Sequence, residues 1–237
     1  MGERAGCGGC SVIAVNISIV ANVNIVNMVQ RRGTKTPAKA AYHHGDLPHA
    51  LIEAAQRLIE SGGSARLTLR EAAQAAGVSV AAPYRHFADR EALLAAVLAE
   101  GFRELAQRTD HARRAAPDAM ASLVSVGLAY VRFAADRPAI YRLMFGPECD
   151  KAAHADLMAA GHEALAVLVD AVVACKSAGL IGDADVQQVA LAGWAMSHGL
   201  ASLHADGILA TAMPVALDTT AHTLFGMLID GVRPRTR

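Results

Sequence analysis

The stretch LTLREAAQAAGVSVAAPYRHFADREALL, residues 67–94, carries the start and stop signals of several short helices. Thr68 followed by Glu71 forms a capping box, in which the threonine side chain serves the third amide of a helix and the glutamate reaches back to the cap. Gly77 ends that helix, Ser79 is placed to cap the next one, and Asp89 caps a longer one. With the helix that precedes them, these signals predict a helix-turn-helix within a small bundle.

Pro83 lies inside the predicted third helix, where a proline ordinarily costs about 3 kcal/mol. With Ser79 as the N-cap, the only intrahelical bond that Pro83 forfeits is the one to the Ser79 carbonyl, so its cost is smaller. The small residues before the proline allow the positive end of the helix to approach a phosphate closely. Phe87, the apolar member of this stretch, is expected to turn into the core.

The exposed face of this helix carries side chains suited to DNA. Val80 and Ala81 can touch a thymine methyl group, whereas Tyr84, Arg85 and His86 can donate hydrogen bonds to phosphate oxygens. The alternative is a solvated helix face with one incidental tyrosine, and these residues alone leave it open.

Upstream, the chain divides into three parts. A helix capped by Asp46 and ended by residues 61–63 is predicted from apolar residues at helical spacing. Residues 30–45 form a basic arm punctuated by Pro and Gly. Residues 1–29 are a doubtful extension, because the apolar run 11–29 holds four asparagines and lacks a basic lead and a cleavage site. We expect the natural protein to start at Met28, and we expect no metal or redox site at the isolated C-x-x-C of Cys7 and Cys10.

Downstream, helical segments are predicted at about 118–136, 139–145, 151–179, 183–207 and 214–231. Alanine dominates the apolar residues, and no β-hairpin turn or phosphate-binding Gly-rich loop appears, so the fold class is all-α. We expect a DNA-binding domain over 46–110 and a helical regulatory and dimerisation domain over 117–232. The net charge of zero is uneven: residues 31–114 carry 13 Lys and Arg against 9 Asp and Glu, and residues 115–237 carry 8 against 12. The front half therefore favours an anionic partner.

From Tyr42 to about Arg108 the sequence resembles the DNA-binding domain of the TetR/AcrR regulators. Residues 67–94 follow the pattern L-T-x-x-x-x-A-x-x-A-G-V-S-x-x-x-x-Y-x-H-F-x-x-K-x-x-L almost throughout. The resemblance implies base contacts from the start of the second helix and of the third, with phosphate contacts around them. The predicted DNA-binding residues are Thr68, Leu69, Arg70, Ser79, Val80, Ala81, Ala82, Tyr84, Arg85, His86 and Arg90.

Three residues depart from the family pattern. Ala81, Ala82 and Pro83 stand where Gly, Thr and Leu or Ile are common. Because Ala82 lacks the threonine hydroxyl, we expect affinity to depend more on Tyr84, on Arg90 and on the basic arm.

The C-terminal half contains LAGWAMSHGLASLHADG, residues 191–207, which resembles the W…HG signature of one subgroup of these regulators through Trp194, His198 and Gly199. Trp194 and His198 share a helix face, so they contact a ligand, the core or a dimer partner. The resemblance also implies a dimer interface from the last two helices, where Leu217, Leu224 and Leu228 form an apolar stripe. Large side chains among alanines are equally good as pocket or core residues. The ligand-binding candidates are Tyr130, Phe133, Tyr141, Met144, Phe145, Met158, His162, Trp194 and His198.

The sequence thus predicts a cytoplasmic homodimeric repressor that binds a palindromic operator in double-stranded DNA. A small, largely apolar effector would release it, and the alternative is a constitutive DNA-binding regulator without a ligand. We expect no cofactor, no metal and no membrane association. His154 and His162 lie two turns apart, too far for a metal clip. Ser202 and His198 lack the elbow and oxyanion loop that an enzyme of the nucleophile–base type needs, so we expect no catalytic activity.

Overall fold

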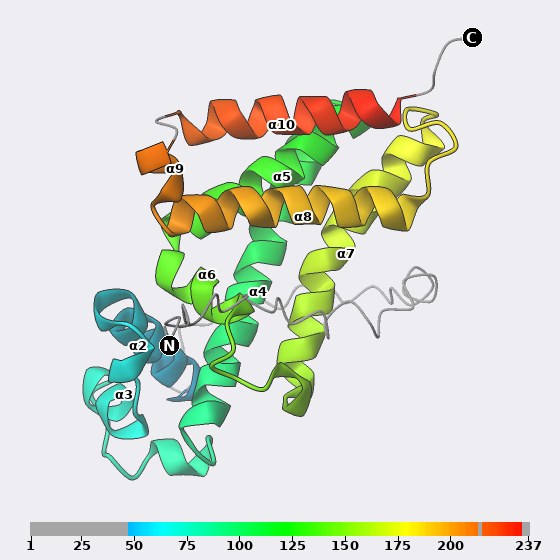
Figure 1. Cartoon of the computed structure of the whole chain (residues 1–237). Helices are drawn as coiled ribbons and strands as arrows, with labels where there is room; N and C mark the ends of the chain where they lie inside the picture. Colours follow the sequence, from blue (N-terminus) through cyan, green and yellow to red (C-terminus); the bar gives the residue numbers. More distant parts are fainter. Residues whose placement is uncertain (1–46, 213–214, 234–237) are drawn as a thin grey trace, which may run out of the picture.

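The computed structural model describes residues 47–212 and 215–233, and within them the chain forms helices and turns without a strand (Figure 1). The expectations for Asp46, Met28, the C-x-x-C and the basic arm lie outside the described residues. The predicted all-α fold class is confirmed. The helices are α2 (Leu47–Gly62), α3 (Leu69–Ala75), α4 (Arg90–Ala115), α5 (Ala119–Asp136), α6 (Pro138–Phe145), α7 (Ala155–Ser177), α8 (Val186–Ala205), α9 (Ile208–Ala212) and α10 (Leu217–Val232).

The N-terminal unit, here called the head, consists of α2, α3, the turn after α3 and the first turns of α4. The Thr68 side chain accepts from the Glu71 amide at 3.0 Å, and the Asp89 side chain accepts from the Ala92 amide at 2.8 Å, so both predicted caps are confirmed. The second half of the capping box differs, because the Glu71 carboxylate accepts from the Thr68 hydroxyl rather than from the cap amide. Phe87 is buried as predicted.

The third helix of the head is much shorter than predicted. Ser79 makes no capping bond, and only the 3₁₀ turn Pro83–Arg85 is helical between α3 and α4. The Ser79 carbonyl accepts from the Ala82 amide at 3.0 Å, which is an i→i+3 bond. Since Pro83 has no N–H to continue an i→i−4 ladder, the chain closes here in tighter turns.

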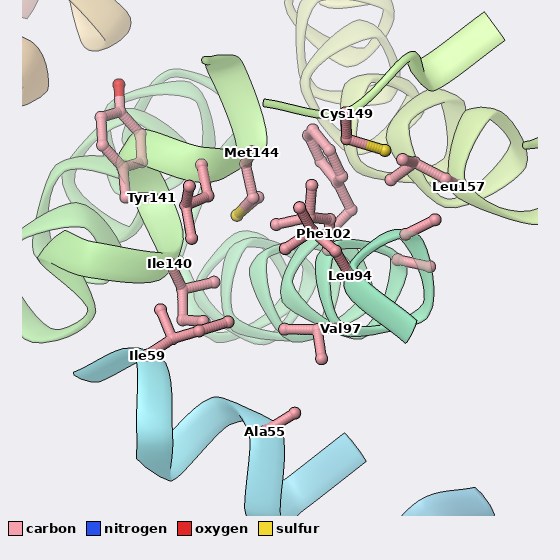
Figure 2. Packing of buried hydrophobic residues seen from close by; sticks show 14 of the residues in the cluster. Ala55, Ile59, Leu94, Val97, Phe102, Ile140, Tyr141, Met144, Cys149 and Leu157 are labelled. Atoms are coloured by element: carbon pink, nitrogen blue, oxygen red, sulfur yellow. The ribbon is translucent and has the colours of Figure 1, made fainter. Parts of the chain in front are cut away.

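The long helix α4 joins the head to the remaining helices, here called the body (Figure 1). Its Leu94 and Val97 belong to the same buried apolar cluster as Ile59 of α2 and Ile140 of α6 (Figure 2). Arg137, between α5 and α6, reaches both sides of this junction: its Nε lies 3.4 Å from Glu60 of α2, and its Nη2 lies 3.8 Å from Glu104 of α4. The head and the body thus share one apolar core and an ion-pair cluster.

In the body, α5 and α7 pack against α4, and α8 and α10 pack on α5 and on each other (Figure 1). Helices α5 and α7 are long and apolar enough to cross a membrane, but 50% and 44% of their most apolar windows are buried inside the protein. This pattern is typical of core helices. Phe225 of α10 packs directly on α5 at Gly127, where a Cβ would lie 2.3 Å from the ring.

The predicted apolar stripe of the last helix does not face outward. Leu217 and Leu224 are half-buried against the cluster formed by Leu128, Val131, Leu200, Ala221 and Phe225, and Leu228 lies beside Gly193 of α8. The leucines of α10 therefore pack this helix against α5 and α8. Other residues make up most of the exposed surface of α8 and α10.

Candidate nucleic-acid interface and ligand cavity

The predicted DNA-reading residues lie on the head, at the start of α3 and in the turn that follows α3. Arg70 is exposed in the first turn of α3. The apolar Val80 and the aromatic Tyr84 are also exposed, with 51% and 63% of their surfaces accessible. The other exposed members of this set are Thr68, Ser79, Ala81, Arg85, His86 and Arg90. These side chains suit double-stranded DNA. Cationic and hydroxyl groups can contact its phosphates, and an exposed valine can contact a thymine methyl group in the major groove.

Three members of the predicted set are placed differently. The Leu69 side chain is buried, so this residue can offer DNA only its backbone. Ala82 is half-buried behind the exposed turn. Arg90 uses its guanidinium within the protein: Nε donates to the Leu67 carbonyl at 2.9 Å and Nη2 donates to the Ser64 carbonyl at 2.8 Å. Arg90 thereby ties the connection between α2 and α3 to the start of α4.

Arg90→Ala should therefore destabilise the head as well as weaken DNA binding. Two carbonyl groups lose charged donors, and we expect the free energy of unfolding to fall by roughly 1–3 kcal/mol. Urea unfolding followed by circular dichroism measures this change, with the exposed Arg85→Ala as the matched control. Unchanged stability in Arg90→Ala would show that these two bonds contribute nothing and that the side chain serves phosphate alone.

The body contains an apolar cavity between α4, α5, α7 and α8, with about 570 Å³ of empty space including its open mouth. Its lining combines aromatic rings with small residues, and none of the lining side chains is charged. The lining residues are Phe102, Leu105, Thr109, Val126, Tyr130, Phe145, Gly161, Ala164, Leu165, Leu168, Trp194 and Ser197.

The predicted ligand-binding residues separate into cavity and core. Tyr130, Phe145 and Trp194 line the cavity. Phe133, Tyr141 and Met144 are instead buried in the core shared with the head, and Met158 and His162 are half-buried on α7 outside the lining. The prediction missed Gly161, Ala164 and Ser197, because small residues give no sign in a sequence that they border empty space. It also missed Phe102 and Leu105, which the helical pattern of α4 assigns equally well to the core.

His198 contacts the cavity wall through Tyr130 and through Phe145, whose ring centroid lies 4.6 Å from that of the imidazole. Its Nδ1 lies 2.7 Å from the Tyr141 hydroxyl and 3.1 Å from the Tyr130 hydroxyl. Burial raises the pKa of Tyr141 to about 12 and raises that of Tyr130 well above its usual value, so both hydroxyls stay protonated. A neutral imidazole nitrogen accepts one hydrogen bond, so only one of the two hydroxyls can donate to Nδ1 at a time.

The His198 ring should make the protein less stable in mild acid. Burial lowers the pKa of His198, so the folded state favours the neutral ring. Its contribution to stability is fully present above the unfolded histidine pKa of about 6.5 and is lost as the pH falls below that value towards the lowered pKa of the folded state. We expect His198→Asn to flatten the loss of unfolding free energy between about pH 6.5 and 5, whereas the exposed His111→Asn should not. Equal pH profiles for wild type and His198→Asn would contradict this account.

The exposed face of α8 is an apolar stripe of small and large residues. Leu191, Ala195, Gly199 and Leu203 recur every four residues, and all four are exposed. A Cβ built at Gly199 would meet no atom of the described chain within 4 Å, so no neighbour within this chain explains the glycine. Met227 of the adjacent α10 is 65% exposed. Within the described residues, α8 and α10 thus present an unpartnered apolar surface.

A helix-turn-helix head joined by one long helix to an all-helical body with an apolar cavity defines a class of DNA-binding regulators. Residues 51–97 match the model of bacterial regulatory proteins of the tetR family, and residues 123–228 match a Tetracyclin repressor-like C-terminal domain. The chain therefore belongs to the TetR family. Its members are transcriptional regulators, and this chain is a DNA-binding regulator rather than an enzyme.

Solved structures share this fold along most of their length. A protein with unknown function from Rhodococcus sp. RHA1 is 34% identical with a TM-score of 0.73, over 83% of this chain and 100% of that one. The TetR family transcriptional regulator PfmR from Thermus thermophilus is 19% identical with a TM-score of 0.59, over 78% and 99%. The transcriptional regulator FadR from Bacillus subtilis, in complex with stearoyl-CoA, is 14% identical with a TM-score of 0.63, over 78% and 99%. No functionally curated protein matches the sequence.

Proposed function

We propose that this regulator is a cytoplasmic homodimeric repressor that binds a palindromic operator and is released by a small molecule in the body cavity. Arg70, Val80 and Ala81 contact bases, and Tyr84, Arg85 and His86 contact phosphates. Two heads related by a two-fold axis would read half-sites one duplex turn apart, about 34–36 Å. Through Trp194, His198 and Gly199 we further assign the body to the subgroup named for those three residues.

The observation that carries this proposal is the path of α4. Phe102, Leu105 and Thr109 of this helix line the cavity, while Leu94 and Val97, about one to four turns earlier, pack in the core shared with α2. A ligand that displaces the cavity end of α4 therefore also moves the helix on which the head is built. Such a ligand favours dimers whose heads are spaced wrongly for the operator, which is a shift of population between two arrangements.

The lining also defines the chemistry of the ligand. A charged group would be buried without a partner, because none of the lining side chains is charged. The hydroxyl protons of Thr109 and Ser197 are already donated to carbonyls of their own helices. When Tyr141 donates to His198, the remaining acceptor for the Tyr130 hydroxyl among these groups is the Tyr141 oxygen at the long distance of 3.5 Å, so Tyr130 can donate to a ligand instead. We infer a neutral, largely apolar ligand that carries a hydrogen-bond acceptor, such as a carbonyl oxygen.

Trp194 provides the experiment, since it is the single tryptophan of the chain and it lines the cavity. Neutral apolar carbonyl compounds are titrated while tryptophan emission and affinity for the operator are recorded. We expect one class of compound to change both. Gly161→Leu should abolish both responses, because a Cβ at Gly161 meets open space and the larger side chain fills the cavity, while operator affinity without ligand stays unchanged.

The contrary result distinguishes the alternative function. If compounds change the Trp194 emission and none changes operator affinity, the protein is a constitutive regulator whose cavity is not coupled to the head. If Gly161→Leu leaves the ligand response intact, the ligand binds elsewhere.

A further inference from the structure

Three potential metal ligands of different chemistry meet where the head joins the body, away from the cavity. Glu91 lies in the first turn of α4, Cys149 lies in the connection that follows α6, and His154 immediately precedes α7. Their ligand atoms all lie within 4.8 Å of one another, and the His154 Nε2 lies 3.8 Å from the Glu91 Oε1. His154 thus meets partners from other elements rather than His162.

The three ligand types fit zinc better than other divalent ions. Zinc accepts thiolate, imidazole and carboxylate in a tetrahedral site, with bonds of about 2.0–2.3 Å and hence ligands about 3.3–3.8 Å apart. The present spacing requires a movement of about 1 Å. Magnesium and calcium prefer sites made wholly of oxygen, so a site with sulfur and nitrogen selects against them.

The surroundings provide access and charge balance. Cys149 is buried at the edge of the core shared by head and body (Figure 2), whereas the Glu91 side chain is 48% exposed and the His154 side chain is 26% exposed. An ion can therefore enter from the Glu91 side and reach the sulfur. A cation bound to the Cys149 sulfur would displace the thiol proton. The nearby Lys151 ammonium group donates to the Gly146 carbonyl at 2.5 Å, so this cation has a partner of its own.

We propose that Glu91, Cys149 and His154 form a zinc-binding site, with water as the fourth ligand. The Glu91 Oε1 already accepts from the Asp150 amide at 3.0 Å, so the connection after α6 and the first turn of α4 are in contact without metal. Zinc would fix this contact. Glu91 directly follows Arg90, whose guanidinium binds the connection between α2 and α3. Zinc binding at this site would thus act on the position of the head independently of any ligand in the cavity.

Cobalt(II) absorption tests the site, because a tetrahedral site with a thiolate gives both ligand-field bands and a sulfur-to-metal charge-transfer band. The experiment uses the full chain with Cys7→Ser and Cys10→Ser, which removes the N-terminal C-x-x-C. We expect one Co²⁺ per chain with both signals, displaced by Zn²⁺ and not by Mg²⁺. Cys149→Ser should abolish the charge-transfer band, and the matched control Cys175→Ser should retain it.

Two further variants keep the test independent of folding at the buried Cys149. His154→Ala and Glu91→Gln alter half-exposed side chains, and each should weaken zinc binding by at least about tenfold. The exposed His111→Ala should leave zinc affinity unchanged. Absence of the thiolate band from the starting protein, or zinc affinity that is the same in His154→Ala and Glu91→Gln as in that protein, would overturn the proposal.

Discussion

Arg70→Ala is expected to lower affinity for the operator by roughly 30-fold or more. Arg70 is exposed at the start of α3, where it can contact a base. Such a contact by arginine contributes about 1–3 kcal/mol. In a two-fold dimer the contact is made in both half-sites, so the substitution removes it twice. The loss should be largest for the natural operator and smaller for operators altered at the contacted base pair. Fluorescence anisotropy with a set of singly substituted operators measures this pattern.

Tyr84→Phe is the companion variant, because it removes one hydroxyl from the same exposed surface and leaves the ring. A phosphate contact has no sequence preference, so affinity should fall by a similar factor for every operator tested. Equal losses across all operators for Arg70→Ala would instead assign Arg70 to the phosphates. Unchanged affinity in both variants would remove this surface from the DNA interface.

Gly199→Glu is expected to convert the proposed dimer to a monomer and to lower operator affinity by about 100-fold or more. The substitution fits within one chain, since a Cβ at Gly199 meets no described atom within 4 Å. Across a two-fold interface on α8, however, it places two carboxylates in an apolar contact. A monomer also loses the gain from binding two half-sites together, which is about 10²–10⁴-fold.

Analytical ultracentrifugation and operator binding measure the two effects of Gly199→Glu together. Ala159→Glu, which adds the same charge at an exposed position of α7, is the matched control and should remain a dimer. The monomer should be folded, because glutamate favours a helix over glycine by roughly 0.5–1 kcal/mol. A folded Gly199→Glu protein that remains dimeric would place the interface elsewhere.

The sequence predicted those features that depend on local chemistry. The caps at Thr68 and Asp89, the end of α2 after residue 61 and the burial of Phe87 all follow from short-range rules, and the structure confirms them. The prediction of a full third helix was wrong, because Pro83 cannot donate to an i→i−4 ladder and the chain closes i→i+3 turns there instead.

The cavity and the outer face of the body could not be predicted in the same way. Core and cavity side chains have the same size and polarity, so Phe133 and Tyr130 are alike in sequence although only Tyr130 lines the cavity. The stripe of Leu217, Leu224 and Leu228 was a correct amphipathic pattern. The neighbour against which this stripe packs depends on tertiary packing. Here the absence of a side chain at Gly127 allows Phe225 of α10 to pack directly on α5.

The ion pairs of Arg137 have a consequence for experiments at different ionic strengths. Its side chain and those of Glu60 and Glu104 are each about three-quarters buried, with exposed fractions of 26%, 28% and 26%. Mobile counterions screen such groups much less than they screen surface charges. The contact between head and body should therefore persist as the salt concentration rises. The slope of operator affinity against salt concentration, on logarithmic axes, then counts the phosphates that each dimer neutralises, at about 0.9 per phosphate.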